Sequence, residues 1–345
     1  MAATAPPRAT LGIPWRAVPP LAAAIALGFG LLASVRYLAR PLAILILAIT
    51  IGEALEPMVT RLEKRMRRSF AIAVVYLVLL GLIALGGWLL VPELIRQARE
   101  IGDQLPALID RGQAFIARWD QAAGGGLART ASERLGQLGG SLVSVPIKAF
   151  AVAVEIVLII FLSAYWLLGS PALLRFVLSL LPPDARTRTA AILEEMGDAM
   201  GGYVRGAAIS AAIMGALAWL GLLAIGVEYA LALGALTTLG EPIPYVGPIL
   251  VGGVVTLVAL AQSPTKALLA IGLYTLLQQI ESNFIAPNVL SRETRTSQAL
   301  VIFALVAGAA VGGLLGALVA IPLASALQVF VVRVLAPAIR RRTGA

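Results

Sequence analysis

Three glutamates in apolar surroundings are the residues of this sequence best suited to chemistry. Glu155 has no charged residue within six positions on either side, and Glu241 and Glu281 each adjoin an apolar run. A charged side chain in hydrocarbon costs at least about 2.5–3.5 kcal/mol, so each carboxylate needs a partner or a role. They could coordinate a polar solute or a cation, or carry protons. Glu155 has a second interpretation, in which it lies near the interface or pairs with an arginine of a neighbouring span.

Glu241 opens a stretch, residues 240–248, that cannot continue an α-helix. Three prolines and two glycines fall within these nine residues: Gly240, Pro242, Pro244, Gly247 and Pro248. Backbone groups freed at membrane depth must face protein or water, and interrupted helices in transporters build solute sites this way. The alternative is an ordinary loop at the membrane surface.

Glu281 lies in a second polar stretch, residues 278–288, which ends an apolar run and contains Pro287. Paired interruptions of this kind are a sequence pointer to a transport site. The candidate residues of a transport path are therefore Glu155, Glu241, Pro244, Tyr245, Gly247, Pro248, Gln279, Glu281, Asn283 and Pro287.

The composition is that of a membrane protein. Hydrophobic residues make up 59% of the 345 residues and charged residues only 13%, whereas soluble domains carry roughly 25% charged residues. The chain has no cysteine and no histidine, which excludes disulfides, thiol chemistry and histidine proton relays. No phosphate-binding glycine loop is present. We expect no enzyme activity, no metal and no cofactor, and the net charge of +9 favours anionic lipid headgroups over nucleic acid.

Apolar runs predict an all-α polytopic membrane protein, since a span needs about 20 apolar residues. About eight transmembrane helices are expected, two of them interrupted at 240–248 and 281–288. The expected segments are 17–35, 37–56, 70–91, 147–168, 203–226, 229–261, 265–285 and 299–333.

The connecting segments predict the topology. Residues 1–16 are expected to be a disordered cytoplasmic N-terminus, 169–202 a cytoplasmic connecting helix and 336–345 a basic cytoplasmic tail. The basic loop 57–69 falls on the same side as both termini, as the positive-inside rule favours. Residues 92–146 repeat apolar residues every three to four positions, which predicts an extracytoplasmic amphipathic helical segment. It either rests on the membrane domain or contacts another subunit.

The last apolar segment would be roughly 55 Å long as one straight helix, far more than the hydrocarbon core of about 30 Å. Pro322 is the expected breaking point. Gly308, Gly312 and Gly316 recur every four residues, which indicates close helix packing, with sliding of one helix past another as the alternative.

Several motifs together resemble the AI-2E family of transporters, the autoinducer-2 exporter superfamily. They are the run from Ile243 to Pro248, then Gln279 to Asn283 with Pro287, the glycine-rich span ending Ala320 to Leu323, and Phe161 to Leu168. The chain departs from the family pattern at Gly169-Ser170-Pro171, at Ala207 and at Glu241.

The resemblance implies eight spans, both termini inside the bacterial cytoplasmic membrane, and a homo-oligomer, specifically a pentamer. It also implies secondary transport. The leading hypothesis is export of a small polar solute, such as an autoinducer-2-like signal or metabolite, with H⁺ or Na⁺ as possible coupling ions. The alternatives are a sodium/proton antiporter and a non-transporting membrane scaffold.

Overall fold

The computed structural model describes residues 18–123, 145–244, 246–290 and 298–343. Within these ranges the chain is helical throughout, with short turns and no strand, which confirms the all-α fold class. The expectations for residues 1–16 and for the second part of 92–146 lie outside the described residues. The helices are α1 (Val18–Glu63), α2 (Arg68–Ala123), α4 (Val145–Ser179), α5 (Pro183–Ile225), α6 (Ala230–Gly240), α7 (Val246–Gln262), α8 (Pro264–Ile280), η2 (Glu281–Leu290), α9 (Gln298–Phe330), η3 (Val331–Leu335) and α10 (Ala336–Thr343).

Five of the described helices are long and apolar enough to cross a membrane, compared with the eight segments expected. One reason is that the segments at 17–35 and 37–56 form a single continuous helix, α1. The two expected segments were separated at Arg36, and a charged residue does not break a helix. Even Pro41 is accommodated within α1.

The segment at 229–261 is divided, as expected, into α6 and α7. Both helices are too short to span alone. They form a hairpin in which the backbones touch, since a Cβ on Gly247 would lie only 1.8 Å from the carbonyl oxygen of Gly240. The hairpin starts and ends at the same end of the molecule, where Gln262 accepts a hydrogen bond from the Glu228 N–H and Lys266 donates to the Gly226 carbonyl.

The expected interruption at 281–288 takes a different form, because α8 passes without a break into the π-helix η2. Pro287 lies inside η2. The wider turn of a π-helix accommodates a proline, which has no N–H, without forming a loop. The second expected interruption is therefore a transition from α-helix to π-helix.

α9 folds back on itself at Gly313, where φ is +60° and ψ is −139°. The expected break at Pro322 is wrong. Pro322 is fully buried inside the second arm of α9. Glycine adopts a positive φ without strain, so the chain can reverse at Gly313. Pro322 lies in the second arm, where the chain does not reverse. Gly308 and Gly316 meet across the hairpin, and a Cβ on Gly308 would lie 2.3 Å from the Gly316 carbonyl oxygen.

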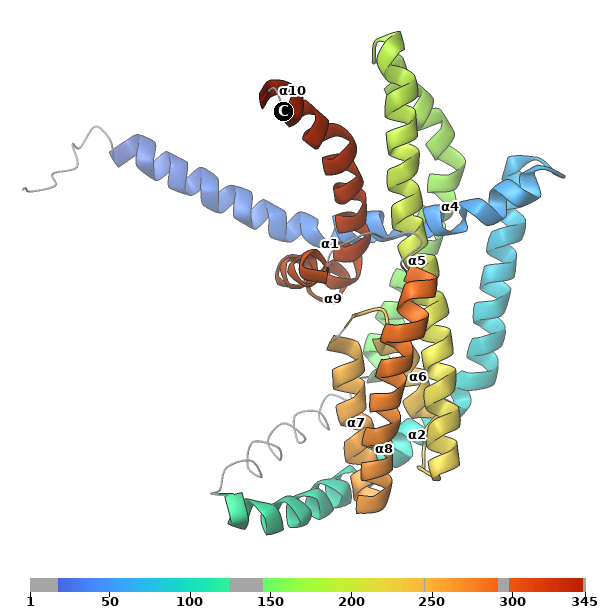
Figure 1. Cartoon of the computed structure of the whole chain (residues 1–345), viewed down its shortest axis with the longest axis vertical. Helices are drawn as coiled ribbons and strands as arrows, with labels where there is room; N and C mark the ends of the chain where they lie inside the picture. The colour runs from blue at the N-terminus through green and yellow to red at the C-terminus, as the bar shows by residue number, and fades with distance from the viewer. Residues whose placement is uncertain (1–17, 124–144, 245, 291–297, 344–345) are drawn as a thin grey trace, which may run out of the picture.

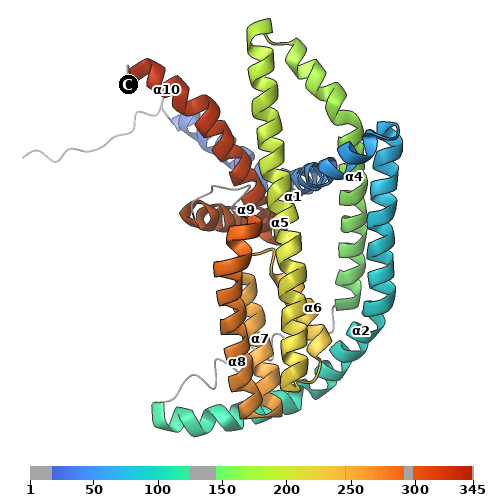
Figure 2. The ribbon, with the colours of Figure 1, turned by 45° about the vertical axis from the view of Figure 1, so that its right-hand side comes forward.

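The helices form two groups (Figures 1 and 2). α5, α6, α7 and α8 lie side by side along the long axis and share one apolar core built around Leu222, Leu233, Val255 and Ala270. α1 runs across this axis and packs with the start of α2 and with α4 around Val59, Tyr76 and Leu167. α9 lies against both α1 and α5.

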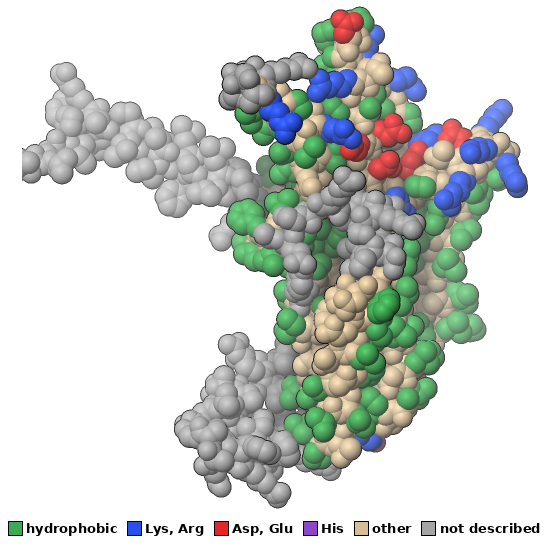
Figure 3. Space-filling view, viewed as in Figure 1, with side chains coloured by type: hydrophobic (Ala, Val, Ile, Leu, Met, Phe, Trp, Pro, Cys, Tyr) green, Lys and Arg blue, Asp and Glu red, His purple; other side chains and the backbone are tan. Residues whose placement is uncertain are grey.

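Charged side chains gather at one end of the molecule (Figure 3). The end that carries the α1–α2 turn, the α4–α5 turn and α10 shows most of the lysine, arginine and acidic side chains, while the opposite half of this face is largely apolar. An apolar belt below a basic end is the pattern of a protein embedded in a bilayer.

Candidate functional site

The turn between α6 and α7 buries the carboxylate of Glu241. α6 ends at Gly240 because Pro242 and Pro244 cannot continue it, and the chain resumes helix at Val246. Glu241 is only 7% exposed. The predicted neighbours Gly247 and Pro248 begin α7, with Gly247 buried and Pro248 half-buried. Pro244 is half-buried in the turn, while Tyr245 lies outside the described residues.

α5 supplies two hydroxyl groups to this turn. The Ser210 hydroxyl donates to Glu241 Oε1 at 3.2 Å, and the Tyr203 hydroxyl donates to the Pro242 carbonyl at 3.5 Å. Both side chains are buried. Neither residue was among the sequence candidates, because a serine or tyrosine inside an apolar helix carries no pattern of its own.

The carboxyl group of Glu281 approaches that of Glu241 closely enough for a hydrogen bond between them. Gln278 Nε2 donates to Glu281 Oε2 at 2.8 Å. None of the ion pairs found among the described side chains includes either glutamate. Two carboxylates this close repel each other unless they share a proton or a cation.

Two further hydroxyl groups border the glutamate pair. The hydroxyl groups of Thr237 on α6 and Tyr274 on α8 form a hydrogen bond of 2.6 Å. Tyr274 also interacts electrostatically with Glu241. We call Tyr203, Ser210, Thr237, Glu241, Tyr274 and Glu281 the carboxylate site. It is lined by oxygen atoms and is held by α5, α6, α8 and η2.

The other described sequence candidates are exposed or have partners elsewhere. Gln279 and Asn283 are exposed, and Asn283 Nδ2 donates to both oxygens of Gln279 at 3.0 Å. The side chain of Pro287 is outside the described set. Glu155 on α4 pairs with Arg40 on α1 at 3.1 Å, which matches the interpretation of a partner in a neighbouring span.

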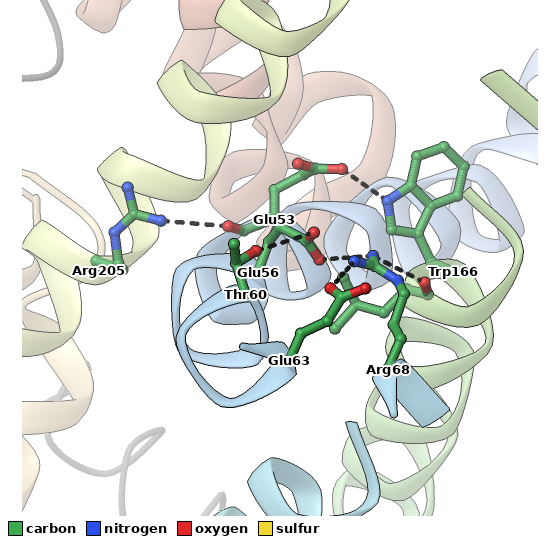
Figure 4. Close-up of polar contacts among 8 residues, drawn as sticks. Glu53, Glu56, Thr60, Glu63, Arg68, Trp166 and Arg205 are labelled. Atoms are coloured by element: carbon green, nitrogen blue, oxygen red, sulfur yellow. Dashed lines mark hydrogen bonds and ion pairs between the residues drawn. The ribbon is translucent and has the colours of Figure 1, made fainter. Parts of the chain in front are cut away.

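A second polar cluster was missed by the sequence analysis (Figure 4). Glu53 accepts a hydrogen bond from Trp166 Nε1 at 2.8 Å, and Arg68 joins Glu56 at 3.0 Å to Glu63 at 3.1 Å. The cluster ties the end of α1 to α2 and α4. Glu53 and Glu56 lie at the edge of an expected span, where acidic residues are common, so no sequence pattern indicated their pairing.

The long apolar helices define a multi-pass membrane protein. More specifically, residues 21–336 match the AI-2E family of transporters, and the chain belongs to this family.

Curated relatives carry corresponding names. The chain is 27% identical to "Putative transport protein YueF" of Bacillus subtilis over 290 residues, which is 79% of each chain. It is 25% identical to "Putative transport protein YrrI" of the same organism, over 84% of this chain and 86% of the relative. It is also 25% identical to "Putative permease PerM" of Escherichia coli, over 87% and 88%.

Proposed function

We propose that this transporter is a secondary exporter of a small polar solute, and that Glu241 and Glu281 couple the movement to a proton or a cation. The observation that supports this most directly is the close pair of carboxyl groups at a broken helix, inside a bundle of apolar helices. Such a pair binds one positive charge far better than either carboxylate alone.

The surroundings of the pair support a polar solute. The hydroxyls of Tyr203, Ser210, Thr237 and Tyr274 can donate and accept hydrogen bonds, and they come from three different helices. When the pair loses its shared charge, repulsion between the carboxylates favours separation of the α6–α7 hairpin from η2. That separation would open the site, which is how an ion gradient could drive solute movement.

The experiment uses the purified protein in liposomes that contain a pH-sensitive dye. We expect a pH change when a small polar solute, such as an autoinducer-2-like signal, is loaded on one side, and loss of at least about 90% of it in Glu241→Gln and in Glu281→Gln, since a neutral amide cannot share the charge. The matched control is Glu228→Gln, which neutralises an exposed glutamate at the opposite end of the bundle. Unchanged signals in both site variants would remove the pair from the path.

The second candidate is a sodium/proton antiporter, which the carboxylate pair itself favours. An antiporter requires no organic solute, so sodium alone would move protons in the same liposomes. The exporter gives a proton flux only when its solute is present. A sodium-driven pH change without any solute would therefore decide for the antiporter.

We further propose that the protein lies in the cytoplasmic membrane with the basic end and both chain termini inside. The gathering of basic residues at the α1–α2 turn, the α4–α5 turn and α10 supports this orientation. The family resemblance supports a homo-oligomer, specifically a pentamer, which native mass spectrometry in detergent would test.

A further inference from the structure

Three of the arginine side chains in the described structure bond to backbone carbonyls of helices far from them in sequence. Each contact joins two different helices and is of hydrogen-bond length. The pairs are Arg205 to the Glu53 carbonyl at 3.2 Å, Arg68 to the Leu167 carbonyl at 3.2 Å, and Arg188 to the Arg333 carbonyl at 3.0 Å.

For each arginine, one accepting carbonyl lies four residues before a proline; Arg205 Nη1 also lies 3.3 Å from the Ala54 carbonyl, which has no proline four residues after it. The prolines are Pro57 after Glu53, Pro171 after Leu167, and Pro337 after Arg333. Proline has no N–H, so the carbonyl four residues before it loses its usual helical donor. A carbonyl without a donor is costly away from water. The arginine in each case supplies the missing hydrogen bond from a neighbouring helix.

The joint between Arg205 and α1 has a second, independent feature. Gly197 and Gly201 precede Arg205 by two turns and one turn on the same face of α5. A Cβ on Gly201 would lie 2.5 Å from the carbonyl carbon of Glu53, and one on Gly197 would lie 2.6 Å from its carboxylate. These glycines let α5 approach the α1 backbone where Arg205 donates, and Figure 4 shows the guanidinium directed at that carbonyl.

Arg205 also lies next to the carboxylate site along α5. Tyr203 and Ser210, which bond to Pro242 and Glu241, are within five residues of it on the same helix. A rotation or shift of α5 against α1 would therefore move both hydroxyl groups relative to the glutamate pair.

We propose that Arg205 is a positioning residue: it docks α5 on the α1 carbonyl vacated by Pro57 and so fixes Ser210 and Tyr203 against Glu241. Arg68 with Pro171, and Arg188 with Pro337, form joints of the same chemistry elsewhere. The effect on transport rests on the function proposed above, whereas the joint itself does not, and the two parts are tested separately.

The joint is tested by a double-mutant cycle on thermal unfolding of the full-length protein in nanodiscs. Arg205→Met leaves the Glu53 carbonyl without its donor, and we expect the midpoint to fall by about 3–6 °C. Pro57→Ala restores a helical N–H at position 57. In the Arg205→Met background it should recover at least about half of the loss.

The pair of Arg188 and Pro337 provides the matched control. Pro337→Ala should not rescue Arg205→Met, and Pro57→Ala should not rescue Arg188→Met, because each proline vacates a different carbonyl. If Pro57→Ala and Pro337→Ala rescue Arg205→Met equally, or neither does, the proposed joint is wrong. Arg205→Lys keeps a donor and a charge, so it should retain more stability than Arg205→Met if both variants fold.

Positioning is read out without any transport assay. The chain has no cysteine, and Ser210 is only 3% exposed, so a Ser210→Cys thiol should react slowly with a maleimide. Adding Arg205→Met should accelerate labelling roughly tenfold, since loss of a charged hydrogen bond favours opening by that order. Adding Arg188→Met should leave the rate unchanged. Equal labelling rates with and without Arg205 would overturn the positioning role, whatever the transport result.

Discussion

At the scale of single residues, the Ser210 hydroxyl gives a specific prediction. It donates to Glu241, and a hydrogen bond to a charged group contributes roughly 1.5–3 kcal/mol. We expect Ser210→Ala to reduce proteoliposome flux about tenfold. The matched control is Ser325→Ala, which removes an equally buried hydroxyl that bonds only to the Ile321 carbonyl of its own helix. Equal losses in the two variants would show that Ser210 contributes packing and no site chemistry.

Residue identities and spacing predicted part of the site. Glu241 and Glu281 stand out because acidic residues are costly beside apolar runs, and the structure brings them together across 40 positions of sequence. Ser210 and Tyr274 could not be identified, because hydroxyl residues are common within spans. The three arginine contacts could not be predicted either. Each depends on a proline four residues after the accepting carbonyl, and that proline lies on a different helix from the arginine.

At the scale of elements, the α9 hairpin gives different surroundings to glycines that hold equivalent positions in the sequence repeat. A Cβ on Gly308 would clash with the Gly316 carbonyl, whereas nothing lies within 4 Å of one on Gly312. Gly308→Ala should cost about 1–3 kcal/mol through overpacking. Gly312→Ala should be neutral or stabilising by up to about 1 kcal/mol, because glycine in a helix is unfavourable. Thermal unfolding of the two variants, side by side, measures the difference, and a loss of stability in Gly312→Ala alone would contradict the hairpin.

Gly313 adds a different cost in the same element. Its φ of +60° is strained for any residue with a Cβ, at roughly 1–2 kcal/mol. Gly313→Ala should therefore lower the unfolding midpoint although no atom lies near its Cβ position. A midpoint unchanged from the wild type would mean that the turn does not form at this residue.

Element boundaries followed from sequence only where the helix-breaking residues were unambiguous. The prolines after Glu241 predicted a real break, since two of them act within the same turn. Pro41, Pro57, Pro171 and Pro322 are all tolerated inside helices. A single proline removes one backbone hydrogen bond, and a neighbouring arginine or close packing can offset that loss. The turn at Gly313 was not foreseen because the glycine repeat suggested packing rather than reversal.

At the scale of the whole molecule, the proposed orientation can be tested by labelling from one side. Ser179 lies at the end of α4 near the basic end, and Thr265 lies at the start of α8 at the opposite end; both are exposed. In this cysteine-free chain, Ser179→Cys and Thr265→Cys each give a unique thiol. A membrane-impermeant maleimide added to intact cells should label Thr265→Cys and spare Ser179→Cys until the membrane is opened. The reverse pattern would invert the orientation.

The α9 hairpin and the α6–α7 hairpin share a topological consequence. Each returns to the side from which it starts, so neither changes whether the number of membrane crossings is odd or even. With α2, α4, α5 and α8 plus η2 taken as the crossings between the α1–α2 turn and α10, the proposed topology has four of them. That is an even number, so the turn and α10 share a side. A count of eight spans gives the same sidedness, because it counts each of the two hairpins as one crossing, and two added crossings leave the number even. The proposed sidedness therefore does not depend on which of the two crossing counts is used.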